Sequence, residues 1–254
     1  KFMKNFRIIS RLEVKTDHVI KGIRMEGLRK VGDPVELAIK YFKDGADEIF
    51  YDDIVASLYN RKYNIDLIKR ISSNIHIPLL VSGGIKSLNN MHEIFNAGAD
   101  KVALNTYAVR NPHLISKAAR VFGSQSICVQ VQFKQYYENY WEILTESGRE
   151  RTKKNILDWI KKVYSLGAGE IILISVDHDG IGNFIGRDPL KQFRSECKLP
   201  LIYGGGINSN TNIQSLIDLK YDGALISNVL HFRKMDITNI KKNLSKIRTN
   251  IINI

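Results

Sequence analysis

Two segments with paired glycines have residue types suited to binding phosphate. Residues 78–87 read PLLVSGGIKS and residues 200–209 read PLIYGGGINS, so a Gly-Gly-Ile turn follows an apolar run in both. Glycines in such a turn let the backbone approach a ligand closely, with amide N–H groups free to donate to an anion. Further along the chain, each segment is followed by a pair of small polar residues. We therefore predict two phosphate-binding sites, formed by Gly83, Gly84, Asn105 and Thr106 and by Gly205, Gly206, Ser227 and Asn228.

Both predicted sites lie within an internal repeat. A shift of 122 residues aligns the two glycine segments and also aligns LNT at residues 104–106 with ISN at residues 226–228. The same shift aligns GADEI at residues 45–49 with GAGEI at residues 167–171, without a gap. A lone Gly-Gly pair is as often just a tight turn, but duplication of the whole set favours a ligand. Two related sites predict one elongated substrate with a phosphate at each end.

Short β-rich segments alternate with stretches of helical apolar spacing along the chain. The helical spacing is clear at residues 91–95 and 156–163. Strands that alternate with helices form parallel sheets, and eight such units fit a closed (β/α)8 barrel, the TIM barrel. With the repeat, this predicts one α/β domain made of two half-barrels, at about residues 1–122 and 123–254. The predicted strands are residues 7–14, 48–54, 78–82, 101–106, 127–133, 170–176, 200–203 and 223–228.

Both glycine turns fall at the predicted C-terminal ends of strands. Active sites of such barrels are built at that end, from the loops that follow the strands. The loop over residues 135–151 is longer than the others and contains its own hairpin pattern.

The charge balance favours small anionic ligands over nucleic acid. The chain carries 38 Lys and Arg against 26 Asp and Glu, a net charge of +12. The basic residues are spread out, and no cluster is interleaved with aromatic residues as a nucleic-acid platform requires. We interpret the charge as a solvated surface that also attracts phosphorylated substrates.

Other patterns indicate a cytoplasmic protein without cofactors. No apolar run approaches the roughly 18 residues of a membrane span, and the apolar run after the first residues is too short for a signal peptide. The two cysteines, Cys128 and Cys197, lie in apolar or strand-like stretches, which indicates a reducing compartment. The six histidines are scattered, and no Rossmann or P-loop fingerprint is present. We therefore predict neither a metal nor a cofactor.

Over its whole length the chain resembles the HisF family, the cyclase subunits of imidazole glycerol phosphate synthase. The matches span every predicted βα unit. The sister isomerase barrel of histidine biosynthesis would not be expected to carry the loop that runs from Lys-Gly (21–22) to Gly-Asp-Pro (32–34). It would also not be expected to carry the strand end DIVAS (53–57). The matching segments are RIISRLEV (7–14), VIKG (19–22), GDPVEL (32–37), DEIFYDDIVAS (47–57), GADKVALNT (98–106), GAGE (167–170), DHDG (177–180) and HFR (231–233).

This resemblance implies a lyase that works with a HisH-type glutaminase. The glutaminase docks on the N-terminal face of the barrel, and its ammonia passes through the interior to attack a bisphosphorylated ribulosyl-formimino nucleotide. Asp100 matches an acidic residue that faces the glutaminase. The positions that match the ring around the ammonia entrance are Arg7, Glu48, Lys101 and Glu170. The alternative for these four is a salt-bridge network with a purely structural role.

The reaction of the family needs two carboxylates, one on the first strand and one on the fifth, as general base and general acid. The matching positions here are Glu13 and Gln132. Glutamate can still transfer a proton, although its extra methylene shifts the carboxylate. The amide of Gln132 has no titratable proton near neutral pH and cannot act as an acid or a base. Ile174 and Gly204 also depart from the family at this end of the barrel.

Five further residues are assigned to substrate or phosphate by the resemblance. Lys21 would close over a phosphate from a mobile loop after the first strand, and Asp53 would be a polar anchor at the end of the second. The other three are Ser147, Asp179 and Gly180.

Two functions stay open at this point. One is the histidine-pathway reaction, which yields imidazole glycerol phosphate. The other belongs to a divergent branch, whose barrels conduct ammonia to an N-acetyl sugar amidotransferase in surface-glycan biosynthesis. The retained entrance ring fits both functions, and Gln132 favours the second.

Overall fold

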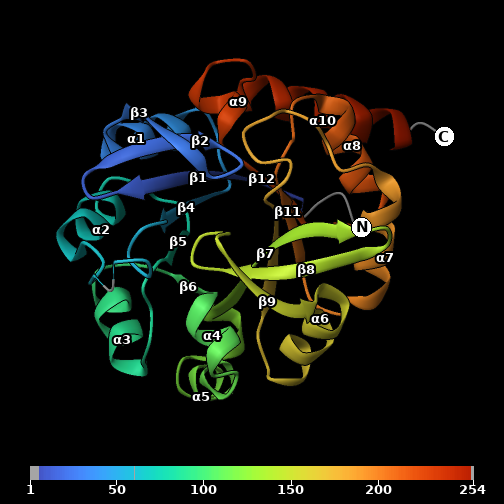
Figure 1. The fold of residues 1–254 in the computed structure, drawn as a ribbon. Coiled ribbons are helices and arrows are strands. Elements are labelled where there is room, and N and C mark those ends of the chain that lie inside the picture. Colours follow the sequence, from blue (N-terminus) through green and yellow to red (C-terminus); the bar gives the residue numbers. More distant parts are fainter. Residues whose placement is uncertain (1–5, 60, 253–254) are drawn as a thin grey trace.

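A closed barrel of parallel strands forms the centre of the molecule (Figure 1). The computed structural model describes residues 6–59 and 61–252. Each barrel strand pairs with the next along the chain, and the last pairs with the first. All eight predicted strands and the TIM-barrel fold are confirmed. The barrel strands are β1 (Arg7–Lys15), β4 (Glu48–Asp53), β5 (Leu79–Ser82), β6 (Lys101–Leu104), β7 (Ile127–Tyr137), β10 (Glu170–Ser175), β11 (Leu201–Gly204) and β12 (Gly223–Ile226).

Helices connect the strands and cover the outside of the barrel (Figure 1). Ser87 and Ser209 cap two of them, accepting hydrogen bonds from the backbone N–H of Asn90 and Asn212. Within the described residues, no helix is both long and apolar enough to span a membrane. The helices are α1 (Pro34–Lys43), α2 (Ile65–Ser72), α3 (Leu88–Asn96), α4 (Thr106–Arg110), α5 (His113–Phe122), α6 (Ile156–Ser165), α7 (Arg187–Glu196), α8 (Asn210–Asp218), α9 (Asn228–His231) and α10 (Ile237–Ile252), with a short 3-10 turn at Ser124–Ser126.

The elements repeat at the shift found in the sequence. Strands β4, β5 and β6 begin 122 residues before β10, β11 and β12, and α3 begins 122 residues before α8. A polar contact repeats as well, because the carboxylates of Asp100 and Asp222 accept from the backbone N–H of Leu79 and Leu201, each at 2.8 Å. The boundary between half-barrels near residue 122 stays a prediction.

Two antiparallel extensions arise at equivalent places, after β1 and after β7. Strands β2 (His18–Ile23) and β3 (Glu26–Gly32) follow β1, and β8 (Tyr140–Thr145) and β9 (Glu150–Asn155) follow β7. The second extension confirms the hairpin predicted at residues 135–151. The first differs from the loop expected there. The end of β1 continues beyond the barrel and pairs with β2, which places Lys21 on a strand.

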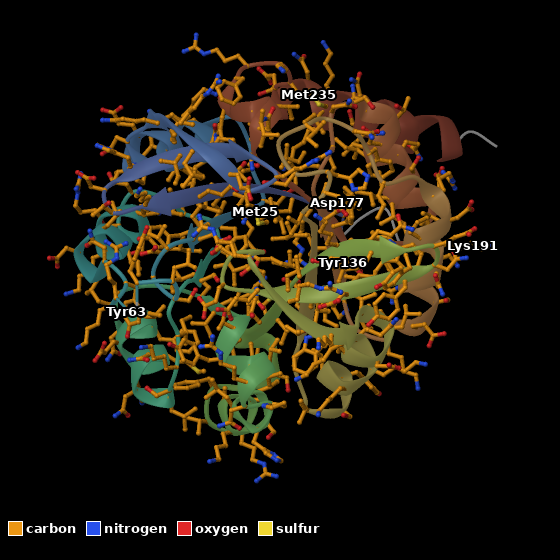
Figure 2. All side chains as sticks on the ribbon, in the orientation of Figure 1. Met25, Tyr63, Tyr136, Asp177, Lys191 and Met235 are labelled. Carbon is orange, nitrogen blue, oxygen red and sulfur yellow. The ribbon has the colours of Figure 1, made fainter. Side chains whose placement is uncertain are left out.

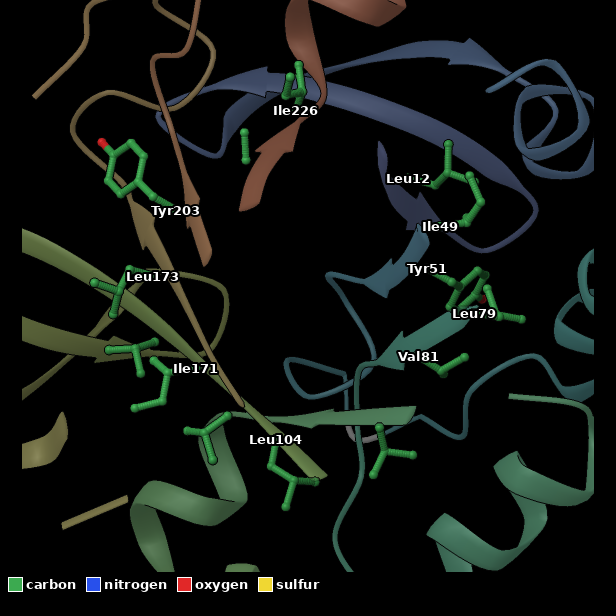
Figure 3. Close-up of a cluster of buried hydrophobic side chains, with 14 of the residues drawn as sticks. Leu12, Ile49, Tyr51, Leu79, Val81, Leu104, Ile171, Leu173, Tyr203 and Ile226 are labelled. Atoms are coloured by element: carbon green, nitrogen blue, oxygen red, sulfur yellow. The ribbon is translucent and has the colours of Figure 1, made fainter. Parts of the chain in front are cut away.

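Side chains alternate between the two faces of the barrel strands. The outward-facing apolar side chains of strands all round the barrel pack against the helices, and several are drawn in Figure 3. The inward-facing apolar side chains form a separate cluster that includes Ile9, Phe50, Cys128 and Ile172. Polar residues continue these inward-facing rows toward both ends, and they build the sites described next.

Candidate functional site

Two cavities open at the C-terminal ends of the barrel strands. The first, of about 30 Å³, follows β4, β5, β6 and β7. The second, of about 20 Å³, follows β10, β11 and β12. The structure thus gathers the residues of each predicted phosphate site into one cavity. The first cavity is lined by Asp53, Gly83, Gly84, Asn105, Thr106, Gln132 and Ser147, and the second by Asp179, Gly180, Gly205, Gly206, Ser227 and Asn228.

The first glycine of each turn is required by its backbone and its surroundings. Gly83 has φ of +114° and Gly205 has φ of +103°, a region that favours glycine. A Cβ atom at these positions would lie 2.5 Å from the carbonyl oxygen of Asp53 and 2.6 Å from that of Ser175. The turns therefore pack tightly on the ends of the neighbouring strands and present their backbone to the cavities.

The polar pairs close the two cavities on the side of the next strand. The Asn105 side chain donates to Gln132 Oε1 at 3.0 Å, and the Asn228 side chain donates to the carbonyl oxygen of Gly180 at 3.2 Å. The helices that follow, α4 and α9, have only five and four residues. They contribute the N–H groups of a single turn rather than the dipole of a long helix.

Asp53 is a buried carboxylate in the wall of the first cavity. Its Oδ1 accepts from the backbone N–H of Val55 at 3.1 Å and of Ala56 at 3.0 Å, and Arg61 lies 3.8 Å away. Burial raises the pKa of Asp53 to about 6, although these hydrogen bonds and Arg61 act in the opposite direction. Ser147, from the turn between β8 and β9, donates to the carbonyl oxygen of Ile54 and joins that turn to the cavity wall.

Glu13 and Lys21 form a buried ion pair near the second cavity. Lys21 Nζ lies 2.9 Å from Glu13 Oε1 and 2.7 Å from Asp179 Oδ2, so it joins β1 to the loop after β10. Gln132, at the position matched to the second carboxylate, lines the first cavity. The structure therefore puts the predicted general base and its amide counterpart on β1 and β7, strands that face each other across the barrel.

Sequence reasoning missed four polar residues that extend this ion pair through the interior. Arg11 lies 3.0 Å from Glu13 and 2.7 Å from Asp52. Gln130 donates to Asp52 at 2.9 Å and accepts from the Ser82 hydroxyl at 3.0 Å. A charged residue within an apolar strand, as in RIISRLEV, is the sequence feature that could have indicated a buried polar network. We call Arg11, Glu13, Lys21, Asp52, Ser82, Gln130 and Asp179 the central network.

The middle of the C-terminal end is covered by apolar side chains. Met25, at the tip of the β2–β3 hairpin, packs with Leu144 and Val176 in the same cluster as the inward-facing residues of the barrel. In Figure 2, Met25, Tyr136 and Asp177 lie toward the middle of the view. They come from the hairpin after β1, the end of β7 and the segment after β10.

The four residues predicted to ring the ammonia entrance meet at the other end of the barrel. Arg7 contacts Glu48 at 2.8 Å and also pairs with Glu170. Lys101 lies 2.8 Å from Glu48 and 3.4 Å from Glu170. Cations and carboxylates thus alternate in a closed charged ring, the name used below for Arg7, Glu48, Lys101 and Glu170.

Burial and charge act against each other in the charged ring. Burial would lower the pKa of Arg7 and of Lys101, but the charges of Glu170 and Glu48 outweigh it and raise both. Burial raises the pKa of Glu48, against the effect of Lys101. The positive charges of Arg7 and Lys101 are thus stabilised by the two carboxylates.

Two predictions remain to be compared with the structure, the surface position of Asp100 and metal binding. Asp100, the predicted contact with the glutaminase, is exposed and accepts from the backbone N–H of Leu79. Its counterpart Asp222 makes the same contact, so the hydrogen bond itself is a feature of the repeat. Within residues 6–59 and 61–252, no three His, Cys, Asp or Glu side chains are placed to hold a metal ion.

Comparison with known proteins identifies the family. The model for "Histidine biosynthesis protein" matches residues 7–236. Imidazole glycerol phosphate synthase subunit HisF of Thermococcus onnurineus is 40% identical over 240 residues, which cover 94% of this chain and 95% of the relative. HisF of Methanocaldococcus jannaschii is 39% identical, covering 93% and 94%, and HisF of Legionella pneumophila is 42% identical, covering 81% and 97%. The chain belongs to the HisF family of histidine biosynthesis proteins.

Proposed function

We propose that this chain is the synthase subunit that converts a bisphosphorylated ribulosyl-formimino nucleotide and ammonia into imidazole glycerol phosphate. The observation that carries the proposal is the pair of cavities at the C-terminal end. Each is built on a Gly-Gly turn and a small polar pair, and the two sets lie 122 residues apart. Such a site suits one substrate with a phosphate at each end.

Glu13 is the residue we assign to proton transfer. It is a buried carboxylate near the C-terminal end of β1, and Lys21 and Arg11 hold it in place. A proton-transfer group must be held within hydrogen-bond reach of its substrate, and two cations fix the position of this one. Gln132 can orient a substrate through hydrogen bonds but has no proton to exchange.

The charged ring is the proposed entrance for ammonia. Its ion pairs close the N-terminal end of the barrel, and passage requires at least one of them to open. The source of ammonia would be a HisH-type glutaminase docked on that face, with exposed Asp100 at the contact. The relatives are named as subunits, which supports an assembly. We assign the reaction to the cytoplasm, since both cysteines are free thiols.

The test of this function is turnover by the isolated chain with excess ammonium salt at alkaline pH. We expect product from the native chain, and a loss of about 10²–10⁴-fold in Glu13→Gln, the contribution typical of general acid–base catalysis. Stabilisation of both proteins by inorganic phosphate against heat checks that the cavities are intact. Undiminished turnover in Glu13→Gln would overturn the role of Glu13.

One observation favours a second candidate function. Gln132 cannot transfer a proton, and Ile174 puts an apolar side chain where the family has a small polar one. These changes suit a diverged barrel that delivers ammonia to an N-acetyl sugar amidotransferase, giving an acetamidino sugar. Absence of turnover by the native chain, together with ammonia-dependent labelling of a sugar when the amidotransferase is added, would select this candidate.

A further inference from the structure

The central network lies across the barrel interior, between the charged ring and the two cavities. Along β1 the inward-facing residues run from Arg7 through Ile9 and Arg11 to Glu13. An apolar layer therefore separates the ring from the network. Every member of the network is buried, with at most 3% of the residue exposed.

Arg11 is held on several sides. Its guanidinium donates to Asp52 Oδ2 through Nε at 3.0 Å and through Nη2 at 2.7 Å. Its Nη1 lies 3.0 Å from Glu13 Oε1 and 3.9 Å from Asp179 Oδ1. Since Arg11 is only 1% exposed, water does not compete for these contacts.

The contacts of Asp52 carry the network from one wall of the barrel to the other. β7 lies four strands from β1 in either direction around the barrel, so these strands face each other. Asp52 receives Arg11 from β1 and Gln130 from β7 at 2.9 Å. Ile174 of β10 is also fully buried, in the interior cluster. The contacts of Asp52 therefore span the interior at this layer.

Apolar side chains lie between this layer and the charged ring. Cys128 is one of them, packed in the interior cluster with Ile9, Phe50 and Ile172. Cys128 is the register partner of Glu170 on β10, which places the thiol beside the ring. Burial raises the pKa of the Cys128 thiol, and the charge of Glu170 adds to this effect. The thiol can thus report on access to this part of the interior.

We propose that Arg11 is a seal within the barrel, which closes the interior between the charged ring and the C-terminal cavities. A small neutral molecule such as ammonia passes this layer only when a contact of Asp52, with Arg11 or with Gln130, opens. The barrel then has two ion-pair closures in series, one at each side of the apolar layer around Cys128. The seal goes beyond the proposed function and is measured without it, so the failure of either leaves the other standing.

The test measures modification of Cys128 in the full chain with Cys197→Ser, which leaves one thiol. Methyl methanethiosulfonate is the probe, and mass spectrometry gives the rate. We expect Arg11→Ala to raise the rate at least tenfold over the parent, because it empties the space between β1 and β4. Gln130→Ala removes an uncharged side chain and leaves every ion pair in place, and we expect a smaller increase.

Arg7→Ala is the matched control, since it opens the charged ring on the other side of the apolar layer. Circular dichroism checks that each variant is folded, and Gln130→Ala decides the question if Arg11→Ala does not fold. The proposal is overturned if the parent is modified as fast as these variants. It is also overturned if the Arg11 and Gln130 variants keep the parent's slow rate, whether or not Arg7→Ala is modified faster.

Discussion

The two ends of the barrel interior are both lined by ion pairs, but the pairs differ in their contact with water. In the charged ring, the side chains of Arg7 and Lys101 are 25% and 17% exposed. In the central network, those of Arg11 and Lys21 are 2% and 1% exposed. Partly hydrated pairs exchange partners at little cost, whereas breaking a buried pair leaves a charge without solvation. The charged ring can therefore rearrange, while the central network holds its groups in fixed positions.

The charge balance of the two ends differs as well. The charged ring has two cations and two carboxylates, whereas the central network has two cations, Arg11 and Lys21, and three carboxylates, Glu13, Asp52 and Asp179. A further carboxylate on β7 would add to the excess negative charge of the central network. The neutral amides of Gln130 and Gln132 avoid that repulsion, which is a physical reason for their presence here.

The largest effect is expected where a buried pair is broken. Arg11→Met should lower the free energy of unfolding by about 3–5 kcal/mol, because Asp52 stays buried without its cation. Arg7→Met should lower it by about 1 kcal/mol, since Lys101 remains with both carboxylates of a partly hydrated ring. Urea denaturation followed by tryptophan fluorescence measures both variants. Equal losses would remove the distinction between the two ends.

A smaller effect is expected in the pH dependence of stability, from Asp53 in the wall of the first cavity. The pKa of Asp53 is about 6 in the folded chain against an ordinary value of 3.8, so between these values the folded state holds the proton and the unfolded state does not. Stability therefore falls as pH rises through this window, by about 3 kcal/mol for a shift of this size. Relative to Asp53→Asn, the native chain should lose this stability between about pH 4 and pH 6. A difference between the two proteins that is constant with pH would contradict the assignment.

The smallest stability effect compares the two cavities with each other. Gly83→Ala and Gly205→Ala should each lower the free energy of unfolding by about 2 kcal/mol, because the backbone angle is strained for alanine and the added Cβ meets a carbonyl oxygen. Gly27→Ala is the control, since Gly27 also has a positive φ of +62° but no atom within 4 Å of the new Cβ. It should cost about 1 kcal/mol. Thermal unfolding measures all three, and a cost in one cavity only would show that the two turns are not equivalent.

The fold and both cavities could be predicted because they follow from local patterns. The Gly-Gly turns, the small polar pairs and the shift of 122 residues are visible in the sequence, and a barrel collects strand ends at one face. The structure accordingly gathers Gly83 with Asn105 and Gly205 with Ser227. The roles of these residues in binding stay predictions.

The central network could not be predicted, since it depends on which strands face each other across a closed barrel. Arg11 and Asp52 are separated by forty other positions, and nothing in either segment indicates that they pair. The β2–β3 hairpin was missed for a related reason. Its pairing is set by the length of β1 beyond the barrel, and the segment EGLRKVG of β3 is too polar to look like a strand.

Ammonium-driven turnover of the ribulosyl-formimino nucleotide, compared between the native chain and Gln132→Asp, tests the proposed reaction and the role of position 132 together. We expect product from the native chain, with Glu13 as its one carboxylate of the pair. We expect at least a tenfold increase in Gln132→Asp, since a second proton-transfer group typically adds about 10²–10⁴-fold. Equal turnover by the two proteins would contradict the assignment of position 132. Absence of product from both would contradict the proposed reaction itself.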